Sequence, residues 1–256
     1  MPRPIVSPAR ASRTTGAPRA ALAAVSVAAA LLGEATPAPA LARETVCERG
    51  PAAPRRRYSV AAIGDSLTDP RSGGGGYLEV LRARCPASRF DAYGVGGQRT
   101  GHLRWRFARE VLGVGAGPNA PRYDHVVVLA GVNDLGVQSV RAASSRAARE
   151  NLAWMYAAAR RHGVATIALT LPPWTGVTSR DARAAETLAL NDWIRGRAAA
   201  GDVDRVVDVF PLLSCGDSDR LCPSLRRFSD DLVHWNRAGH ELVGGALARE
   251  IFSDCE

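Results

Sequence analysis

The sequence predicts an α/β domain in which helices cover both faces of a parallel sheet. Short apolar segments rich in valine, isoleucine and alanine recur along the chain, and longer segments with helical spacing separate them. The 256 residues are 46% hydrophobic, which is enough for a sizeable core and argues against a disordered chain. Neither an internal repeat nor a second folded domain is evident in the sequence.

Strands are expected where apolar runs are short and end in turn-forming residues. The clearest is 125–130 (HVVVLA), and the others are expected at 58–64, 90–95, 164–171 and 205–210. Helices are expected where apolar residues recur at steps of three and four, at 77–84, 100–112, 137–162 and 180–200. Asn236 can cap a last helix. Because the carboxyl ends of parallel strands share one edge, the loops that follow the strands should meet there.

The N-terminal residues 1–42 are typical of a signal peptide. A basic stretch precedes the uncharged apolar run 20–32, and small residues at 38–42 offer cleavage sites. The run is shorter than the roughly 20 residues that span a bilayer, so a retained anchor is the less favoured alternative. We therefore expect a signal peptide at 1–42, a linker at 43–57 and one folded domain at 58–256. The mature protein would be secreted or periplasmic, without stable membrane insertion.

The net charge of +8 comes from arginine alone, since the chain has no lysine. The arginines form no stripe interleaved with aromatic residues, so no nucleic-acid partner is expected. Export would permit disulfides among the five cysteines. Cys215 and Cys222 bracket a polar segment and are the best local pair, whereas joining Cys47 to Cys255 would leave Cys85 unpaired. No CxxC pair or histidine cluster indicates a metal site.

A serine follows the first expected strand directly, in the sequence GDSLT at 64–68. Ser66 would then lie at the shared edge, with its backbone N–H near a helix start. This is not the nucleophile elbow of α/β-hydrolases, because Thr68 stands where that motif has glycine. Serine is also common as a turn or capping residue, so this segment alone does not establish catalysis.

The next two strands end in segments that offer hydrogen-bond donors. In GVGGQRT at 94–100 a glycine can let the backbone approach a bound oxygen, whereas a dinucleotide fingerprint fails because Arg99 occupies its third glycine position. In GVND at 131–134 the side-chain amide of Asn133 is a neutral donor of the kind that acyl transfer needs. Glycine and asparagine are also ordinary turn residues.

A carboxylate and a histidine precede the last helix. Asp231 lies three residues ahead of His234, so it can fold back to accept the Nδ1–H and leave Nε2 facing the edge. Asp230 is the rival carboxylate and His240 the rival base, although His240 lies inside the helix and has no acid at that spacing. Together these segments supply a nucleophile, a base with its orienting acid, and donors for a negative oxygen.

The blocks GDSL, GxND and DxxH, in this order, resemble those of the SGNH hydrolases, the GDSL lipase/esterase family, over about 58–251. The resemblance implies a flavodoxin-like three-layer α/β/α fold with a five-stranded parallel sheet of order 2-1-3-4-5. It also implies a catalytic triad and an oxyanion hole. The triad would be Ser66, His234 and Asp231, and the oxyanion donors would be the N–H groups of Ser66 and Gly97 and the amide of Asn133.

The sequence departs from the family pattern at two places. Ala92 and Tyr93 stand where members often have an asparagine shortly before the glycine of the GVGGQRT segment, so Gly96 remains an alternative to Gly97. Trp235 replaces the proline that frequently follows the histidine.

The resemblance implies a serine esterase or acylhydrolase that forms an acyl-enzyme on a small or polymer-borne carboxylic ester. We expect a monomer that needs no metal or organic cofactor. The alternatives are a carbohydrate O-acetyl esterase or acyltransferase acting on a cell-surface polymer, and a non-catalytic binding domain of the same fold. The polar segment 211–235 shows no apolar lid, which weakly favours short acyl chains or an exposed polymer. Arg71 and Arg99 could favour an acidic substrate, and Trp174 could line a pocket, although solvated arginines and a buried tryptophan are the commoner outcomes.

Overall fold

The computed structural model describes residues 55–136, 142–174, 182–216 and 220–256, all of which belong to one compact unit. The expected signal peptide and most of the expected linker lie outside these residues. Within the described ranges, no helix combines the length and the apolar character needed to cross a membrane.

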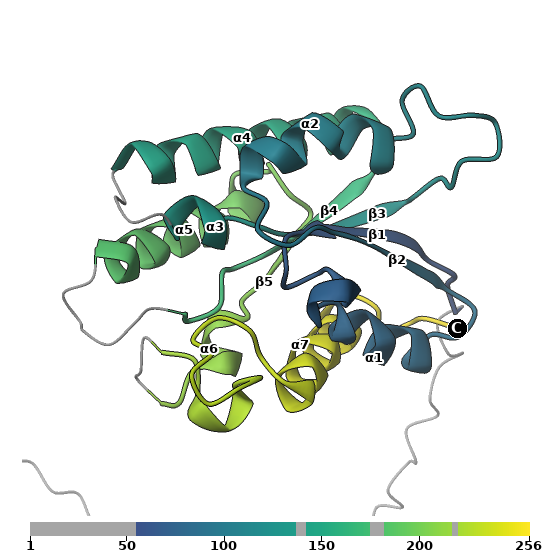
Figure 1. Ribbon diagram of the computed structural model, residues 1–256. Helices are drawn as coiled ribbons and strands as arrows, with labels where there is room; N and C mark the ends of the chain where they lie inside the picture. The colour runs from purple at the N-terminus through teal and green to yellow at the C-terminus, as the bar shows by residue number, and fades with distance from the viewer. Residues whose placement is uncertain (1–54, 137–141, 175–181, 217–219) are drawn as a thin grey trace, which may run out of the picture. The chain divides into compact units, whose positions relative to one another are not determined.

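All strands of the sheet are parallel, and their order is β2-β1-β3-β4-β5 (Figure 1). The central strands are buried on both faces, which explains why their sequences are continuously apolar rather than alternating. This arrangement confirms the predicted fold class and strand order. The strands are β1 (Ser59–Gly64), β2 (Arg89–Gly94), β3 (His125–Leu129), β4 (Ala165–Leu169) and β5 (Arg205–Val207).

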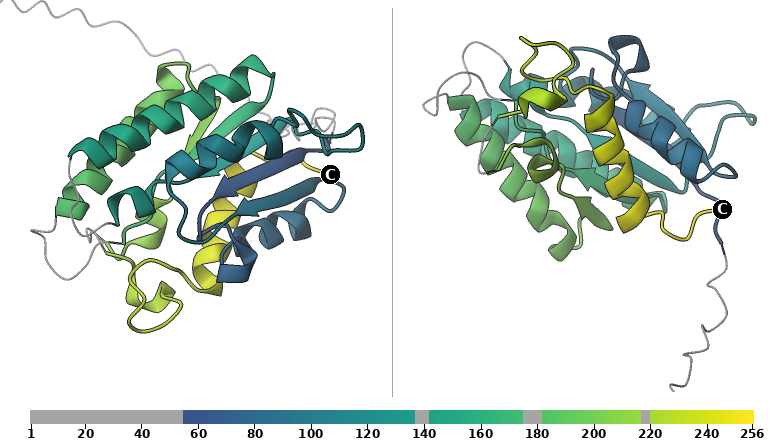
Figure 2. Two further views of the ribbon diagram at one scale, coloured as in Figure 1. Left: turned by 45° about the horizontal axis from the view of Figure 1, so that its top comes forward. Right: turned by 90° about the horizontal axis from the view of Figure 1, so that it is seen from below.

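Helices form a layer on each face of the sheet (Figures 1 and 2). One layer holds α1 (Gly76–Arg84) and α7 (Arg237–Glu250), which pack against each other. The other holds α2 (Thr100–Glu110), α4 (Ala142–Arg161) and α5 (Ala182–Ala199). Asn236 caps α7 as predicted, since its side chain accepts the N–H groups of Ala238 and Gly239. Short helical turns complete the chain: η1 (Pro70–Ser72), α3 (Val132–Leu135), α6 (Phe210–Leu213) and η2 (Pro223–Leu225).

The structure differs from the predicted elements at the end of the last strand and at a short helix after β3. The last strand ends at Val207 rather than at Phe210, because Pro211 favours the first turn of α6. The short helix α3 was not predicted, since four residues are too few to show a helical period. The helices expected at 137–162 and 180–200 are described only from Ala142 and Ala182, because 137–141 and 175–181 lie outside the described residues.

Two disulfides are present in the described residues. The pairing of Cys215 with Cys222 is confirmed. The expectation that Cys255 joins Cys47 and leaves Cys85 unpaired is wrong, because Cys255 bonds to Cys85 at the end of α1. The reason is that the C-terminal segment passes the residues that follow α1, where the Ala87 N–H donates to the Glu256 carbonyl at 3.1 Å.

Candidate active site

Ser66 lies in a tight turn directly after β1. The Asp65 carbonyl accepts the N–H groups of Thr68 and Asp69 at 3.1 and 3.0 Å, which closes this turn. Gly64 is required at its start, since a Cβ there would lie 2.4 Å from the Thr68 hydroxyl oxygen. The turn leaves Ser66 half-buried at the carboxyl edge of the sheet.

The Ser66 hydroxyl, the His234 ring and the Asp231 carboxylate form one hydrogen-bonded chain. His234 Nε2 lies 2.8 Å from Ser66 Oγ, although the two residues are 168 positions apart in the sequence. His234 Nδ1 lies 3.0 Å from Asp231 Oδ2 and 3.2 Å from Oδ1. The structure therefore brings these three predicted residues together in the order that proton transfer from the serine would need.

The turn from Asp231 to His234 holds the carboxylate in place. Asp231 Oδ1 accepts the backbone N–H groups of Val233 and His234 at 3.0 and 2.8 Å. Burial by itself raises the pKa of Asp231, but these N–H donors and the His234 ring outweigh it and hold the pKa below its ordinary value. The carboxylate thus stays ionised beside the imidazole. The rival Asp230 is exposed.

His240, the rival base, has a structural role in the core instead. Its Nδ1 accepts a hydrogen bond from the indole N–H of Trp235 at 2.6 Å, and its Nε2 lies 3.3 Å from the Gly73 carbonyl. Burial lowers the pKa of His240 to about 4, so the ring is neutral near pH 7. Trp235 is almost fully buried, so the residue that replaces the family's proline anchors the histidine loop from inside.

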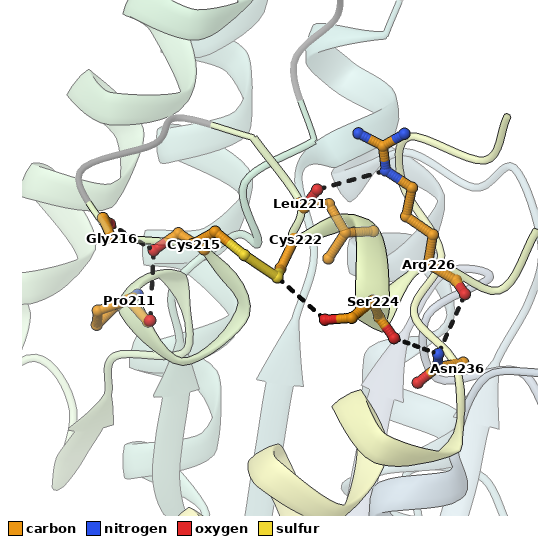
Figure 3. Close-up of a disulfide and its surroundings, with 9 residues drawn as sticks. Pro211, Cys215, Gly216, Leu221, Cys222, Ser224, Arg226 and Asn236 are labelled. Carbon is orange, nitrogen blue, oxygen red and sulfur yellow. Dashed lines mark hydrogen bonds between the residues drawn. A yellow bond between two sulfur atoms is a disulfide. The ribbon is translucent and has the colours of Figure 1, made fainter. Parts of the chain in front are cut away.

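Hydrogen bonds to backbone carbonyls secure the loop that carries His234. The His234 carbonyl accepts the N–H of Arg227 at 2.9 Å. The Asn236 amide donates to the carbonyls of Ser224 and Arg226 at 2.9 and 3.2 Å, close to the Cys215–Cys222 disulfide (Figure 3). The disulfide therefore braces the segment that leads into the histidine loop.

The expected oxyanion donors lie in loops that contact one another. The side-chain amide of Asn133 donates one N–H to the Gln98 carbonyl at 3.0 Å, which ties the loop after β3 to the loop after β2. Its other N–H has no acceptor among the residues that the structure describes. No residue in the described part of the chain accepts the backbone N–H of Ser66 or of Gly97. The N–H of Gly96 is already used by Asp69, at 3.2 Å. This geometry favours Gly97 over Gly96 as the donor.

Sequence reasoning did not single out the buried polar residues behind the site. Arg106 is buried and donates to the carbonyls of Gly64 and Tyr93 at 3.0 and 2.7 Å, so it joins the ends of β1 and β2. Its position offered a signal, because it lies beside the inward-facing Phe107 on the apolar side of α2. Asp69 was not singled out either, because an aspartate after a turn is common.

Asp65 is fully buried within the turn that carries Ser66. Its Oδ1 accepts the Leu67 N–H at 3.0 Å, while its Oδ2 has no hydrogen-bond partner in the described ranges. Burial raises the pKa of Asp65 to about 7, and the nearby Asp134 carboxyl adds to the effect.

We expect Asp65→Asn to change how stability depends on pH. Since the folded-state pKa is raised to about 7, the stability linked to this proton is complete below the ordinary pKa and is lost as the pH rises through 7. Asparagine does not ionise, so the variant should melt about 5 °C above the parent at pH 8.5 and close to it at about pH 4, near the ordinary pKa of the carboxyl. Thermal unfolding followed by circular dichroism measures both values. An equal shift at both pH values would contradict this expectation.

The three residues considered for substrate selection, Arg71, Arg99 and Trp174, differ in how exposed they are. Arg71 is largely exposed and pairs with Asp69 at 3.1 Å, and Arg99 is exposed. Trp174 is buried and donates to the Thr187 hydroxyl at 3.0 Å, as expected for a core residue. In the parts of the chain that the structure describes, no group of three or more His, Cys, Asp or Glu side chains could hold a metal ion.

A parallel sheet between two helical layers, with polar groups gathered at the carboxyl edge of its strands, defines a three-layer α/β protein. In this class of fold, ligands commonly bind at the carboxyl edge of the sheet. Residues 62–242 match the GDSL-like Lipase/Acylhydrolase family, and the chain belongs to this family. A search of curated proteins gave no match.

Solved structures of the same fold include several esterases and lipases. A GDSL-like lipase from Bacteroides thetaiotaomicron VPI-5482 is 18% identical with a TM-score of 0.60, over 77% of this chain and 88% of that one. An acetylxylan esterase from Geobacillus stearothermophilus is 20% identical with a TM-score of 0.60, over 78% and 96%. A member of the lipolytic protein G-D-S-L family from Veillonella parvula DSM 2008 is 18% identical with a TM-score of 0.57, over 76% and 98%. At sequence identities this low, these structural matches show a shared fold and nothing further.

Proposed function

We propose that the protein is a serine esterase or acylhydrolase that cleaves carboxylic esters, with Ser66 as nucleophile, His234 as base and Asp231 as orienting acid. The observation that carries the proposal is the continuous hydrogen-bonded chain from Ser66 Oγ through both nitrogens of His234 to Asp231. Hydroxyl groups are weak nucleophiles near pH 7, and a positioned base is the usual means of activating one.

The geometry suggests acyl transfer in two halves. Ser66 Oγ attacks the ester carbonyl carbon while its proton passes to His234 Nε2, and the resulting imidazolium is stabilised by Asp231. The bond from the carbonyl carbon to the alkoxy oxygen breaks, and His234 gives the proton to the leaving alcohol. Water then attacks the acyl-enzyme with His234 as base, which releases the acid and restores Ser66.

The negative oxygen of each tetrahedral intermediate would be bound by the N–H groups of Ser66 and Gly97 and the amide of Asn133. The free N–H groups of Ser66 and Gly97 and the orientation of Asn133 support this assignment. Such donors stabilise the transition state because they are aimed where charge develops and need no reorganisation.

Asn133→Ala should lower kcat about 100- to 1,000-fold and change KM little, because the donor acts on the transition state rather than on the bound ester. Steady-state hydrolysis of a p-nitrophenyl ester measures both constants. The melting temperature of the variant serves as the control, because the amide also binds the Gln98 carbonyl. A kcat within twofold of the parent would remove Asn133 from the proposed oxyanion hole.

Reaction with a fluorophosphonate tests the proposal as a whole. The reagent should attach to Ser66, as located by peptide mass spectrometry, and the labelled protein should lose its hydrolysis of p-nitrophenyl esters. A series of acyl-chain lengths run alongside would identify the preferred acid. Failure to label and failure to hydrolyse any ester would instead support a non-catalytic binding domain.

A second candidate is a carbohydrate O-acetyl esterase using the same residues. It is favoured by the open surface of 223–230, where most residues are exposed, and by the fold shared with the acetylxylan esterase. Release of acetate from an acetylated polysaccharide, compared with hydrolysis of a free acetate ester, separates the two activities.

The disulfides also support the proposal that the protein is exported, because disulfides persist in oxidising compartments.

A further inference from the structure

The Asp69 carboxylate joins three segments at the edge of the sheet. The residue is 4% exposed and lies three positions after Ser66. Its Oδ2 accepts the Gly96 N–H at 3.2 Å and the Ser72 hydroxyl at 3.1 Å. Its Oδ1 accepts the backbone N–H of Arg71 at 3.0 Å and the Nε–H of the same residue at 3.1 Å. One side chain therefore links the nucleophile turn, the short helix η1 and the loop after β2.

The backbone of Asp69 is fixed as firmly as its side chain. Its N–H donates to the Asp65 carbonyl at 3.0 Å, and its own carbonyl accepts the N–H groups of Ser72 and Gly74 at 3.0 and 2.9 Å. The end of β2 also packs directly on it, since a Cβ at Gly94 would lie 2.1 Å from Asp69 N. The carboxylate is thus a rigid acceptor rather than a freely rotating side chain.

The hydrogen bond from the Gly96 N–H to Asp69 constrains the loop that follows β2. With the Gly96 N–H occupied, the chain turns at Gly97, whose φ of 75° is in the left-handed region, and the Gly97 N–H has no acceptor within the described residues. The loop lies next to the nucleophile, because a Cβ at Gly96 would lie 3.9 Å from Ser66 Cβ. The contact with Asp69 thus fixes the peptide immediately before the proposed oxyanion donor.

The surroundings of Asp69 suit an acceptor and not a base. Burial raises its pKa, but hydrogen bonds from Arg71, Gly96 and Ser72 outweigh this and lower the pKa below the ordinary value. The carboxylate therefore remains ionised wherever a histidine can act as base, and its charge is balanced by the Arg71 guanidinium.

We propose that Asp69 is a positioning residue that sets the oxyanion hole, by tying the Gly96–Gly97 loop to the turn that carries Ser66. This inference rests on the proposed function of the site. Without the tie, the Gly97 N–H would no longer be aimed at the oxygen that becomes negative, and the loss would appear in the transition state rather than in substrate binding.

The test compares Asp69→Ala and Asp69→Asn with Asp204→Asn. Asp204 is an exposed control far from Ser66, because its Oδ2 accepts the Thr166 N–H at 2.7 Å and thereby joins two segments where β4 and β5 begin, at the amino ends of the strands. For each protein, fluorophosphonate titration counts the competent Ser66 groups, and kcat is expressed per titrated site. KM for a p-nitrophenyl ester and the inhibition constant of an alkyl trifluoromethyl ketone, which forms a tetrahedral adduct, complete the set.

Asp69→Ala should lower kcat per titrated site about 30- to 100-fold and leave KM within about threefold. The trifluoromethyl ketone should bind more weakly by the same factor as the loss in kcat/KM. Asp69→Asn keeps one carbonyl oxygen, so its values should fall between those of Asp69→Ala and the parent. Asp204→Asn should keep the parent values even where its melting temperature falls.

Parent values of kcat per titrated site in both Asp69 variants, with only a lower melting temperature, would overturn the inference while leaving the proposed function intact. A parent protein that is neither labelled at Ser66 nor active on esters would overturn both. If Asp69→Ala does not fold, the kcat and ketone affinity of Asp69→Asn decide between these results.

Discussion

Ser66→Ala should abolish ester hydrolysis, lowering kcat by about 10⁴-fold or more, and leave the fold intact. The hydroxyl is half-buried and its hydrogen bond to His234 at 2.8 Å is the contact that the substitution removes, so little packing is lost. We expect the melting temperature to stay within about 2 °C of the parent, consistent with substitutions that remove no core volume. Hydrolysis of p-nitrophenyl acetate and thermal unfolding measure the two effects.

Ser229→Ala is the matched control for this substitution. Ser229 is an exposed serine on the loop that leads to Asp231, and its replacement should leave both activity and melting temperature at parent values. Activity retained by Ser66→Ala would mean that another group attacks the ester, and the role assigned to the hydrogen-bonded chain at 66, 234 and 231 would have to be abandoned.

Removing the Cys85–Cys255 disulfide should have the largest effect on stability. The bond joins residues 170 positions apart, and closing a loop of this length in the unfolded chain is worth about 5 kcal/mol on the chain-entropy estimate. Cys85→Ala/Cys255→Ala should therefore lower the melting temperature by about 10–20 °C. Calorimetry of the oxidised parent and the double variant measures the difference.

The second disulfide provides the internal control. Cys215 and Cys222 are only 7 positions apart, so the same estimate gives about 2.5 kcal/mol for that loop. Cys215→Ala/Cys222→Ala should then be clearly less destabilised than the other double variant. If the short loop proves the more costly to open, chain entropy is not the main contribution of these bonds.

Features that depend on nearby residues were predictable from the sequence. The continuous apolar runs gave β1 and β3, and Asn236 was recognised as the cap of α7 because capping involves only the next few residues. The spacing of Asp231 and His234 indicated their contact for the same reason. Family resemblance supplied what spacing does not, namely the strand order and the pairing of Ser66 with His234.

Features that depend on the path of distant segments were not predictable. Nothing local to Cys255 indicates that the C-terminal segment returns to the end of α1, so its partner was assigned wrongly. The choice between Gly96 and Gly97 likewise depends on which N–H is occupied by Asp69, a residue from another loop. The helical spacing could place Arg106 on the apolar side of α2, but it could not identify its acceptors, the carbonyls at the ends of β1 and β2.

The C-terminal segment runs beside the residues that precede β1, where the Glu256 N–H donates to the Arg56 carbonyl at 2.9 Å. Ser66 follows the other end of that same strand, so the length of β1 separates the proposed nucleophile from Glu256. A surface, resin or carrier protein attached through Glu256 would consequently hold the protein at the amino end of β1, away from Ser66. Its reactive edge would point outward, toward an ester group carried on a bulky or insoluble polymer.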